Sequence, residues 1–362
     1  MAAPGVQLPS LTGLRFFAAI AVMFYHLHLY FTPISESLAL FACGYVGVSF
    51  FFILSGFVLT WSHREDTGYT LFYRNRFARI WPLHAVTMIL AIWVPPLPTS
   101  TESGWLAVPF VLTLSHSWIP ASPFLTAFDG VSWSLSCEAF FYLAFPLLWR
   151  RLIGVRRLTW TIGALFSTLS LVVLLLGAVS SPPTADYLLG TSPLFRIGEF
   201  ILGICLAKLM KEGWRPTLSA FQATLFLTAL MVVLLIASFA AAHLGFAVPV
   251  TVANLVMVPA FLALIAAYAD GDLKGKGGVI RSDVLIRLGG WSFALYLIHE
   301  LVMRAFRQYV ADASTGQAFV IAIIVVLTSI AAAGLLHEFV EKPASRALRG
   351  GRIRARRQVQ HP

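Results

Sequence analysis

Charged side chains are scarce in this sequence, and acidic ones are the scarcest. Asp, Glu, Lys and Arg make up 12% of the 362 residues, whereas 58% are hydrophobic. Soluble domains carry about 25% charged residues, so this composition excludes a soluble enzyme and predicts a polytopic membrane protein. The excess of basic residues gives a net charge of +10. These residues flank apolar runs and form no single basic stripe, so we expect no nucleic-acid partner.

Cysteine is also nearly absent. The three cysteines, Cys43, Cys137 and Cys205, lie far apart in the chain. Their spacing fits neither a paired-cysteine metal motif nor a disulfide framework, so we expect buried apolar fillers and no metal site. The first apolar run lacks a basic segment before it and a small-residue cleavage site after it. It therefore predicts a retained helix and not a signal peptide.

Ten apolar runs are long enough to cross a bilayer. They lie at about 11–31, 43–62, 80–96, 133–149, 158–179, 193–210, 218–242, 249–269, 288–309 and 317–340. An eleventh run, at 105–118, is weaker and shorter. We predict an all-α polytopic membrane protein with ten transmembrane helices over residues 1–345. A basic tail at 346–362 follows.

The positions of the basic residues predict the topology. Most of the 26 Lys and Arg residues fall in five clusters, at 64–79, 150–157, 208–215, 274–287 and 342–357. Basic loops stay on the cytoplasmic side. All five clusters share one side if 105–118 does not cross the membrane. We therefore predict a cell-membrane protein with both termini cytoplasmic and an extracytoplasmic segment at 97–132.

The first apolar run contains two ionisable residues, Arg15 and His26. Such groups are costly inside a membrane helix and usually face the interior of a bundle. Their separation of 11 residues returns them to nearly the same face, about 16 Å apart along the axis. His28 points to nearly the opposite side. A structural role, as a buried histidine bonded to a neighbouring helix, is the alternative for His26.

The stretch FYRNRFARIWP at 72–82 precedes the third apolar run. Arg76 and Arg79 are three residues apart, so they share a helix face. Two guanidinium groups on one face can bind phosphates, and aromatic neighbours suit a nucleotide-bearing ligand. Simple anchoring by positive residues at the cytoplasmic side is the alternative interpretation.

Later apolar runs contain further polar residues. Glu138 lies in the segment SWSLSCEAFFYLAFP. Tyr142 follows it by one helical turn, and Trp133 lies near the approach to its carboxylate. A carboxylate that orients an imidazole makes histidine a competent base, so we predict that Glu138 assists His26. Pairing of Glu138 with a buried arginine is the alternative. Ser55, in the glycine-containing second run, and His299, in WSFALYLIHE, are further candidates for a substrate pocket.

The same motifs resemble the acyltransferase-3 family of membrane acyltransferases. The resemblance rests on six features in order: Arg15 with His26, FFFILSGF, Arg76-x-x-Arg79, WSLSCEAFFY, YLIHE and Glu341-Lys342-Pro343. It covers roughly residues 8–345. The opening LPSLTGLRFFAA and the WSLSCEAFFYLAFPL segment look most like an actinobacterial branch that acylates macrolides.

The resemblance implies a ten-helix fold and transfer of an acyl group, commonly acetyl, from acyl-CoA to a hydroxyl. The acceptor would be a sugar, a cell-envelope glycan or a natural product. The family's essential histidine corresponds to His26 and its companion arginine to Arg15. The arginine pair associated with the donor corresponds to Arg76 and Arg79. We thus expect acyl-CoA as a co-substrate and no permanently bound cofactor, and a homo-oligomer is compatible with this assignment.

A transporter or flippase is the alternative function. It would use the buried His, Arg and Glu side chains as a proton or anion relay. The arginine pair beside aromatic residues favours the enzyme, because a transporter needs no site for a nucleotide-bearing donor.

Overall fold

Helix is the only regular structure in the part of the chain that the structure describes. A computed structural model describes residues 7–65, 67–95, 102–276 and 278–349. Within these ranges it has ten long helices, and each overlaps one of the predicted apolar runs. They are α1 (Pro9–Tyr30), α2 (Gly47–Ser62), α3 (Tyr69–Ala91), α6 (Trp133–Leu152), α7 (Leu158–Val179), α9 (Pro193–Lys211), α10 (Ala220–His243), α11 (Val250–Leu273), α12 (Asp283–Val310) and α13 (Thr315–Leu336).

Eight helical segments of the described ranges are long and apolar enough to cross a membrane. The two long helices outside that set are α3 and α9, which carry charged residues along their length. The all-α polytopic character is therefore confirmed, whereas a total of ten crossings stays a prediction. The weak run at 105–118 forms only short helices. The α-helical one, α4 (Val108–Leu112), has five residues and spans about 7 Å, which is too short to cross.

The structure corrects the start of the third helix and shows where the last one continues. Helix α3 begins at Tyr69, well before the predicted start at 80, because its first turns carry three arginines and so escape a search for apolar runs. At the other end, η9 (His337–Glu341) and α14 (Lys342–Arg349) continue the helix of α13, so the predicted boundary at 345 falls inside a helix. Residues 96–101 and 350–362, parts of the predicted third run, outer segment and tail, lie outside the described residues.

Local sequence signals begin several helices. Pro9 occupies the first turn of α1, where its missing N–H costs nothing. Ser219 before α10 and Ser314 before α13 each accept a hydrogen bond from the glutamine three residues on, whose side chain bonds back. This reciprocal cap satisfies two free backbone donors. Local sequence therefore sets where these two helices begin.

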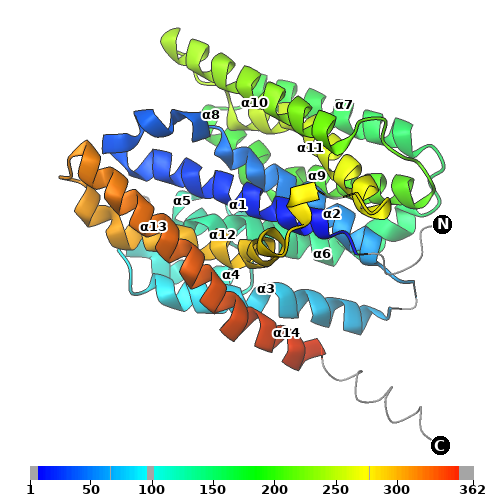
Figure 1. Ribbon diagram of the computed structural model, residues 1–362, viewed down its shortest axis with the longest axis horizontal. Helices are drawn as coiled ribbons and strands as arrows, with labels where there is room; N and C mark the ends of the chain where they lie inside the picture. The colour runs from blue at the N-terminus through cyan, green and yellow to red at the C-terminus, as the bar shows by residue number, and fades with distance from the viewer. Residues whose placement is uncertain (1–6, 66, 96–101, 277, 350–362) are drawn as a thin grey trace, which may run out of the picture.

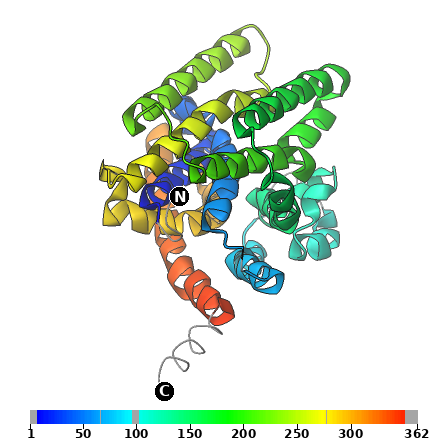
Figure 2. The same cartoon turned by 90° about the vertical axis from the view of Figure 1, so that its right-hand side faces the viewer.

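The helices form an interior group and a peripheral group. Helix α1 packs against α12, α2 against α9, and α12 against α13. Both views place α7 and α10 on one side of the molecule and α3 and α14 on the opposite side (Figures 1 and 2). Helices α7 and α10 are only 6% buried over their apolar windows. Their apolar side chains therefore face lipid, while α1, α2 and α12 build the centre.

Glycine permits the closest approach between helices. A Cβ atom on Gly56 of α2 would stand 2.0 Å from the carbonyl oxygen of Phe200 on α9. A Cβ atom on Gly203 of α9 would stand 2.0 Å from the carbonyl oxygen of Ile53 on α2. Backbones this close leave no room for a side chain. Gly44 and Gly47 likewise let this segment approach α1, because a Cβ on either would meet its backbone or side chains.

Gly203→Ala should therefore destabilise the protein. The added methyl group must push α9 away from α2, and overpacking typically costs about 1–3 kcal/mol. Thermal unfolding in detergent measures the effect. Gly163→Ala in α7 is the matched control, because nothing lies within 4 Å of its Cβ. The control should be neutral or slightly stabilising, and equal unfolding temperatures for both variants would contradict the close-packing interpretation.

Candidate active site

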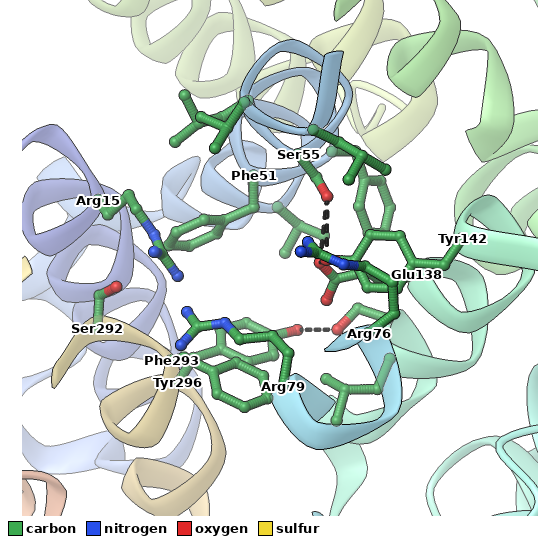
Figure 3. Close-up of a pocket in the computed structure, with 17 residues that line it drawn as sticks. Arg15, Phe51, Ser55, Arg76, Arg79, Glu138, Tyr142, Ser292, Phe293 and Tyr296 are labelled. Atoms are coloured by element: carbon green, nitrogen blue, oxygen red, sulfur yellow. Dashed lines mark hydrogen bonds between the residues drawn. The ribbon is translucent and has the colours of Figure 1, made fainter. Parts of the chain in front are cut away.

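Three arginines from two helices line one cavity inside the bundle. Arg15 of α1 projects into it from one wall, and Arg76 and Arg79 of α3 project from another (Figure 3). The space amounts to about 150 Å³. The predicted shared face of Arg76 and Arg79 is therefore present. Contrary to a purely peripheral anchoring role, both side chains reach the interior of the helix bundle.

Two of these guanidinium groups have no ion-pair partner among the described residues. Arg76 lies over the rings of Tyr142 and Phe72, at 5.5 and 5.9 Å from their centroids. Arg15 makes no hydrogen bond within the described ranges and lines the cavity directly. Guanidinium N–H groups without carboxylate partners are available to an anion.

The third arginine is held by a carboxylate from the far end of the chain. Arg79 forms an ion pair with Glu341 of η9, and His337 Nδ1 lies 2.9 Å from the other Glu341 oxygen. The Arg79 guanidinium also stacks 5.1 Å from the ring centroid of Phe293. The sequence prediction missed Glu341 as a site residue. Glu341 belongs to the Glu341-Lys342-Pro343 motif, but this motif does not indicate that Arg79 is the partner of Glu341.

Glu138 lies in the cavity but not beside His26. Ser55 Oγ donates to Glu138 at 3.1 Å, and the Tyr142 hydroxyl donates to the same carboxylate oxygen. The expected contact between Glu138 and His26 is therefore wrong. Glu138 lines the same cavity as Arg15, whereas His26 stands 11 residues further along α1 and has other neighbours. Glu138 instead forms one polar cluster with Ser55 and Tyr142, which confirms only that these three line one pocket.

His26 pairs with another histidine. His299 Nε2 lies 3.1 Å from His26 Nδ1, and the ring centroids are 5.0 Å apart. His299 is fully buried, whereas His26 is half-buried. His28, by contrast, bonds through Nδ1 to the carbonyl oxygen of Ser35 at 2.8 Å, so it faces away as predicted.

Tyr296 separates the cavity from the two histidines. Its ring lies 6.1 Å from Phe51, which lines the cavity, and 6.0 Å from His299. Its hydroxyl donates to the Val131 carbonyl at 3.0 Å and lies 2.8 Å from Ser134 Oγ. His299 follows Tyr296 by three residues, about 4.5 Å along α12. The histidine pair thus stands one turn beyond the deep end of the cavity.

Other predicted residues serve packing. Trp133 does not line the cavity; its ring packs 6.2 Å from Phe52, which does. Arg196 pairs with Glu199, three residues on in α9, at 3.1 Å and donates to Ser49 Oγ. The three cysteines are buried and free, which confirms their predicted role.

A second buried polar cluster lies further along α1 and α12 than the histidine pair, and no sequence motif indicates it. The Tyr30 hydroxyl donates to Glu300 Oε1 at 3.3 Å, and Asp129 lies beside Glu300. Arg304 donates to the carbonyl oxygens of Pro95 and Phe128. Asp129 comes from the segment before α6, far from Glu300 in sequence. Only the fold reveals that the two carboxyl groups meet.

The arrangement has a chemical polarity. Its α3 side presents guanidinium groups, its middle is apolar, with Phe51, Phe52 and Leu135, and the histidine pair follows. Such a site can hold an anionic molecule whose apolar, reactive end points toward an imidazole. Within the described ranges no group of side chains is placed to hold a metal ion.

Known proteins resemble the chain along most of its length. The acyltransferase-3 family, described as an acyltransferase domain, matches residues 8–337. "Acyltransferase MdmB" of Streptomyces mycarofaciens is 37% identical over 374 aligned residues, which cover 95% of this chain and 93% of that protein. "O-acetyltransferase OatA" of Staphylococcus aureus is 28% identical over 159 residues, covering 39% of this chain and 24% of that protein. No solved structure matches the chain significantly.

Proposed function

We propose that this chain, which belongs to the acyltransferase-3 family, is an acyl-CoA-dependent O-acyltransferase. It moves a short acyl group, acetyl first among the candidates, to a hydroxyl of a sugar, a cell-envelope glycan or a macrolide-type natural product. The observation that carries the proposal is the joint position of Arg15, Arg76 and Arg79 in one cavity, whose deep end lies one helical turn from His26. No permanently bound cofactor is required.

The charge of the cavity suits the donor. CoA carries phosphates, and guanidinium groups bind phosphate oxygens with two parallel hydrogen bonds. Arg15 and Arg76 have such donors free within the described chain. An apolar cavity of about 150 Å³ in another protein holds a molecule of benzene. The space here is also about 150 Å³, so it takes only a small part of an acyl-CoA molecule at a time.

His26 is the base in this proposal. Its Nε2 takes the proton from the acceptor hydroxyl while the oxygen attacks the thioester carbonyl. The carbon–sulfur bond then breaks, and the proton passes from His26 to the departing CoA thiolate. The acceptor reaches His26 past Tyr296 or from the outer side of the bundle. With both termini cytoplasmic, the first turns of α3 meet the cytosolic pool of acyl-CoA.

CoA binding tests the donor site. Arg76→Ala and Arg15→Ala should each lower the affinity for CoA by roughly tenfold or more, because a hydrogen bond to a charged group contributes about 1.5–3 kcal/mol. Neither residue has a carboxylate partner to lose, so the unfolding temperature without CoA should change little. Thermal stabilisation of the purified protein by CoA measures both quantities.

The control for this prediction is Arg74→Ala, which removes an exposed arginine of α3 that does not line the cavity. It should leave CoA binding unchanged. Arg76→Lys should recover only part of the lost affinity, since an ammonium group cannot make the paired contact. An unchanged CoA affinity in the Arg15→Ala, Arg76→Ala double variant would remove the basis for the donor site and favour a transporter that works without CoA.

A further inference from the structure

The Nδ1 atom of His26 faces two hydrogen-bond acceptors. One is the carbonyl oxygen of Val22, at 2.9 Å. The other is Nε2 of His299, at 3.1 Å. The Nδ1 atom of His299 in turn lies 3.0 Å from the carbonyl oxygen of Leu295. This chain of contacts runs from the backbone of α12, through two imidazole rings, to the backbone of α1.

These contacts determine where the protons are. A carbonyl oxygen only accepts, so His299 Nδ1 carries a proton and donates to Leu295. A neutral His299 then has a bare Nε2, which accepts from His26 Nδ1–H. Val22 requires the same proton on His26 Nδ1. The lone pair of His26 therefore lies on Nε2, the ring atom for which the structure gives no partner within the described residues.

We propose that His299 is a positioning residue for His26, holding the imidazole in this tautomer and stabilising the imidazolium that forms when Nε2 takes a proton. The inference rests on the proposed function of His26 as the base. In serine hydrolases a buried carboxylate does this work behind the histidine. Here a neutral imidazole occupies that position, because Glu138 is bonded to Ser55 and Tyr142, and Glu300 to Tyr30.

The effect of His299 should be moderate, because Val22 shares the task. In a serine protease, loss of the orienting carboxylate leaves the wrong tautomer and lowers turnover by about 10⁴-fold. The Val22 carbonyl preserves the tautomer in this protein when His299 is replaced. What is lost is one hydrogen bond that strengthens when His26 becomes charged. Such a bond is worth about tenfold to a hundredfold in rate.

The test compares two replacements of His299 in the full-length protein, purified in detergent. His299→Leu fills similar space but accepts no hydrogen bond, so kcat should fall about tenfold to a hundredfold. His299→Gln places an amide oxygen near the former Nε2 and should restore most of this loss. In both variants the KM for acetyl-CoA and the thermal stabilisation by CoA should remain close to those of the wild type.

Several outcomes would overturn the proposal. Equal kcat values for the leucine and glutamine variants would show that hydrogen-bond acceptance is irrelevant. Loss of CoA stabilisation in both would assign His299 to donor binding or folding. If His299→Leu does not fold, His299→Asn replaces it, because its shorter amide cannot reach His26, and an asparagine variant as active as the glutamine variant overturns the proposal. Absence of acyl transfer in the wild type, by contrast, would refute the proposed function itself.

Discussion

His26→Ala should lower acyl transfer by about 10²–10⁴-fold, which is the usual contribution of a positioned proton acceptor. The expected loss follows from the position of the ring, half-buried and one turn beyond the cavity, with its Nδ1 atom occupied by Val22 and His299. The variant should stay folded and should still bind CoA, because the guanidinium groups of the cavity are untouched. Turnover of acetyl-CoA with a hydroxylated acceptor measures the rate, and thermal stabilisation by CoA measures binding.

His28→Ala is the matched control for this experiment. It removes an imidazole from the same helix, two residues away, whose hydrogen bond goes to the Ser35 carbonyl. Its effect on the transfer rate should be far smaller. A His26→Ala variant with near-normal turnover would refute the base mechanism, and one that no longer binds CoA would move His26 to the donor site.

Arg79→Ala should destabilise the protein by about 3–5 kcal/mol, because it removes the arginine of a buried ion pair and leaves the Glu341 carboxylate with only His337 beside it. The Glu341 side chain is only 4% exposed, whereas Arg79 is 25% exposed, so the abandoned carboxylate cannot turn to solvent. Arg79 therefore differs from Arg76, although the two arginines look equivalent in sequence. The unfolding temperature measured without CoA reports this loss separately from any change in donor affinity.

The double replacement Arg79→Met with Glu341→Leu should recover much of the lost stability. Removing both charges of a buried pair is often close to neutral, since neither is left unpaired. Arg76→Ala, with no carboxylate to abandon, provides the second comparison and should unfold near the wild-type temperature. An Arg79→Ala variant as stable as Arg76→Ala would mean that the contact with Glu341 contributes nothing to folding.

The sequence predicts the helices well because lipid imposes a simple condition on them. A crossing segment must be apolar over about 20 residues, and each of the ten predicted runs overlaps a long helix. The predicted start is wrong for α3, which begins at Tyr69, because the first turns of this helix are not apolar. Arginines that face an internal cavity can lie in a helix although they are not hydrophobic, so a search for apolar runs misses that part of the helix.

The site could be predicted only in part, for a related reason. Helical spacing places Arg76 and Arg79 on one face of α3, and Arg15 and His26 on one face of α1, because the spacing within a single helix is local information. It does not say which helices meet. The pairs Arg79 with Glu341 and His26 with His299 are 262 and 273 residues apart in the chain. Glu138 was assigned to His26 by chemical plausibility alone, and the fold gives that place to His299.

The same long separations bear on how the protein is made. Ribosomes add about 5–20 residues per second, so on the order of ten to fifty seconds pass between the synthesis of Arg79 and that of Glu341, 262 residues later. During that interval Arg15, His26 and Arg79 stand in early helices without their later neighbours. Ionisable groups without partners are costly in lipid. The nascent chain must therefore be kept beside the insertion machinery until α12 and η9 emerge, and any amino-terminal fragment that ends before them should be degraded in the cell.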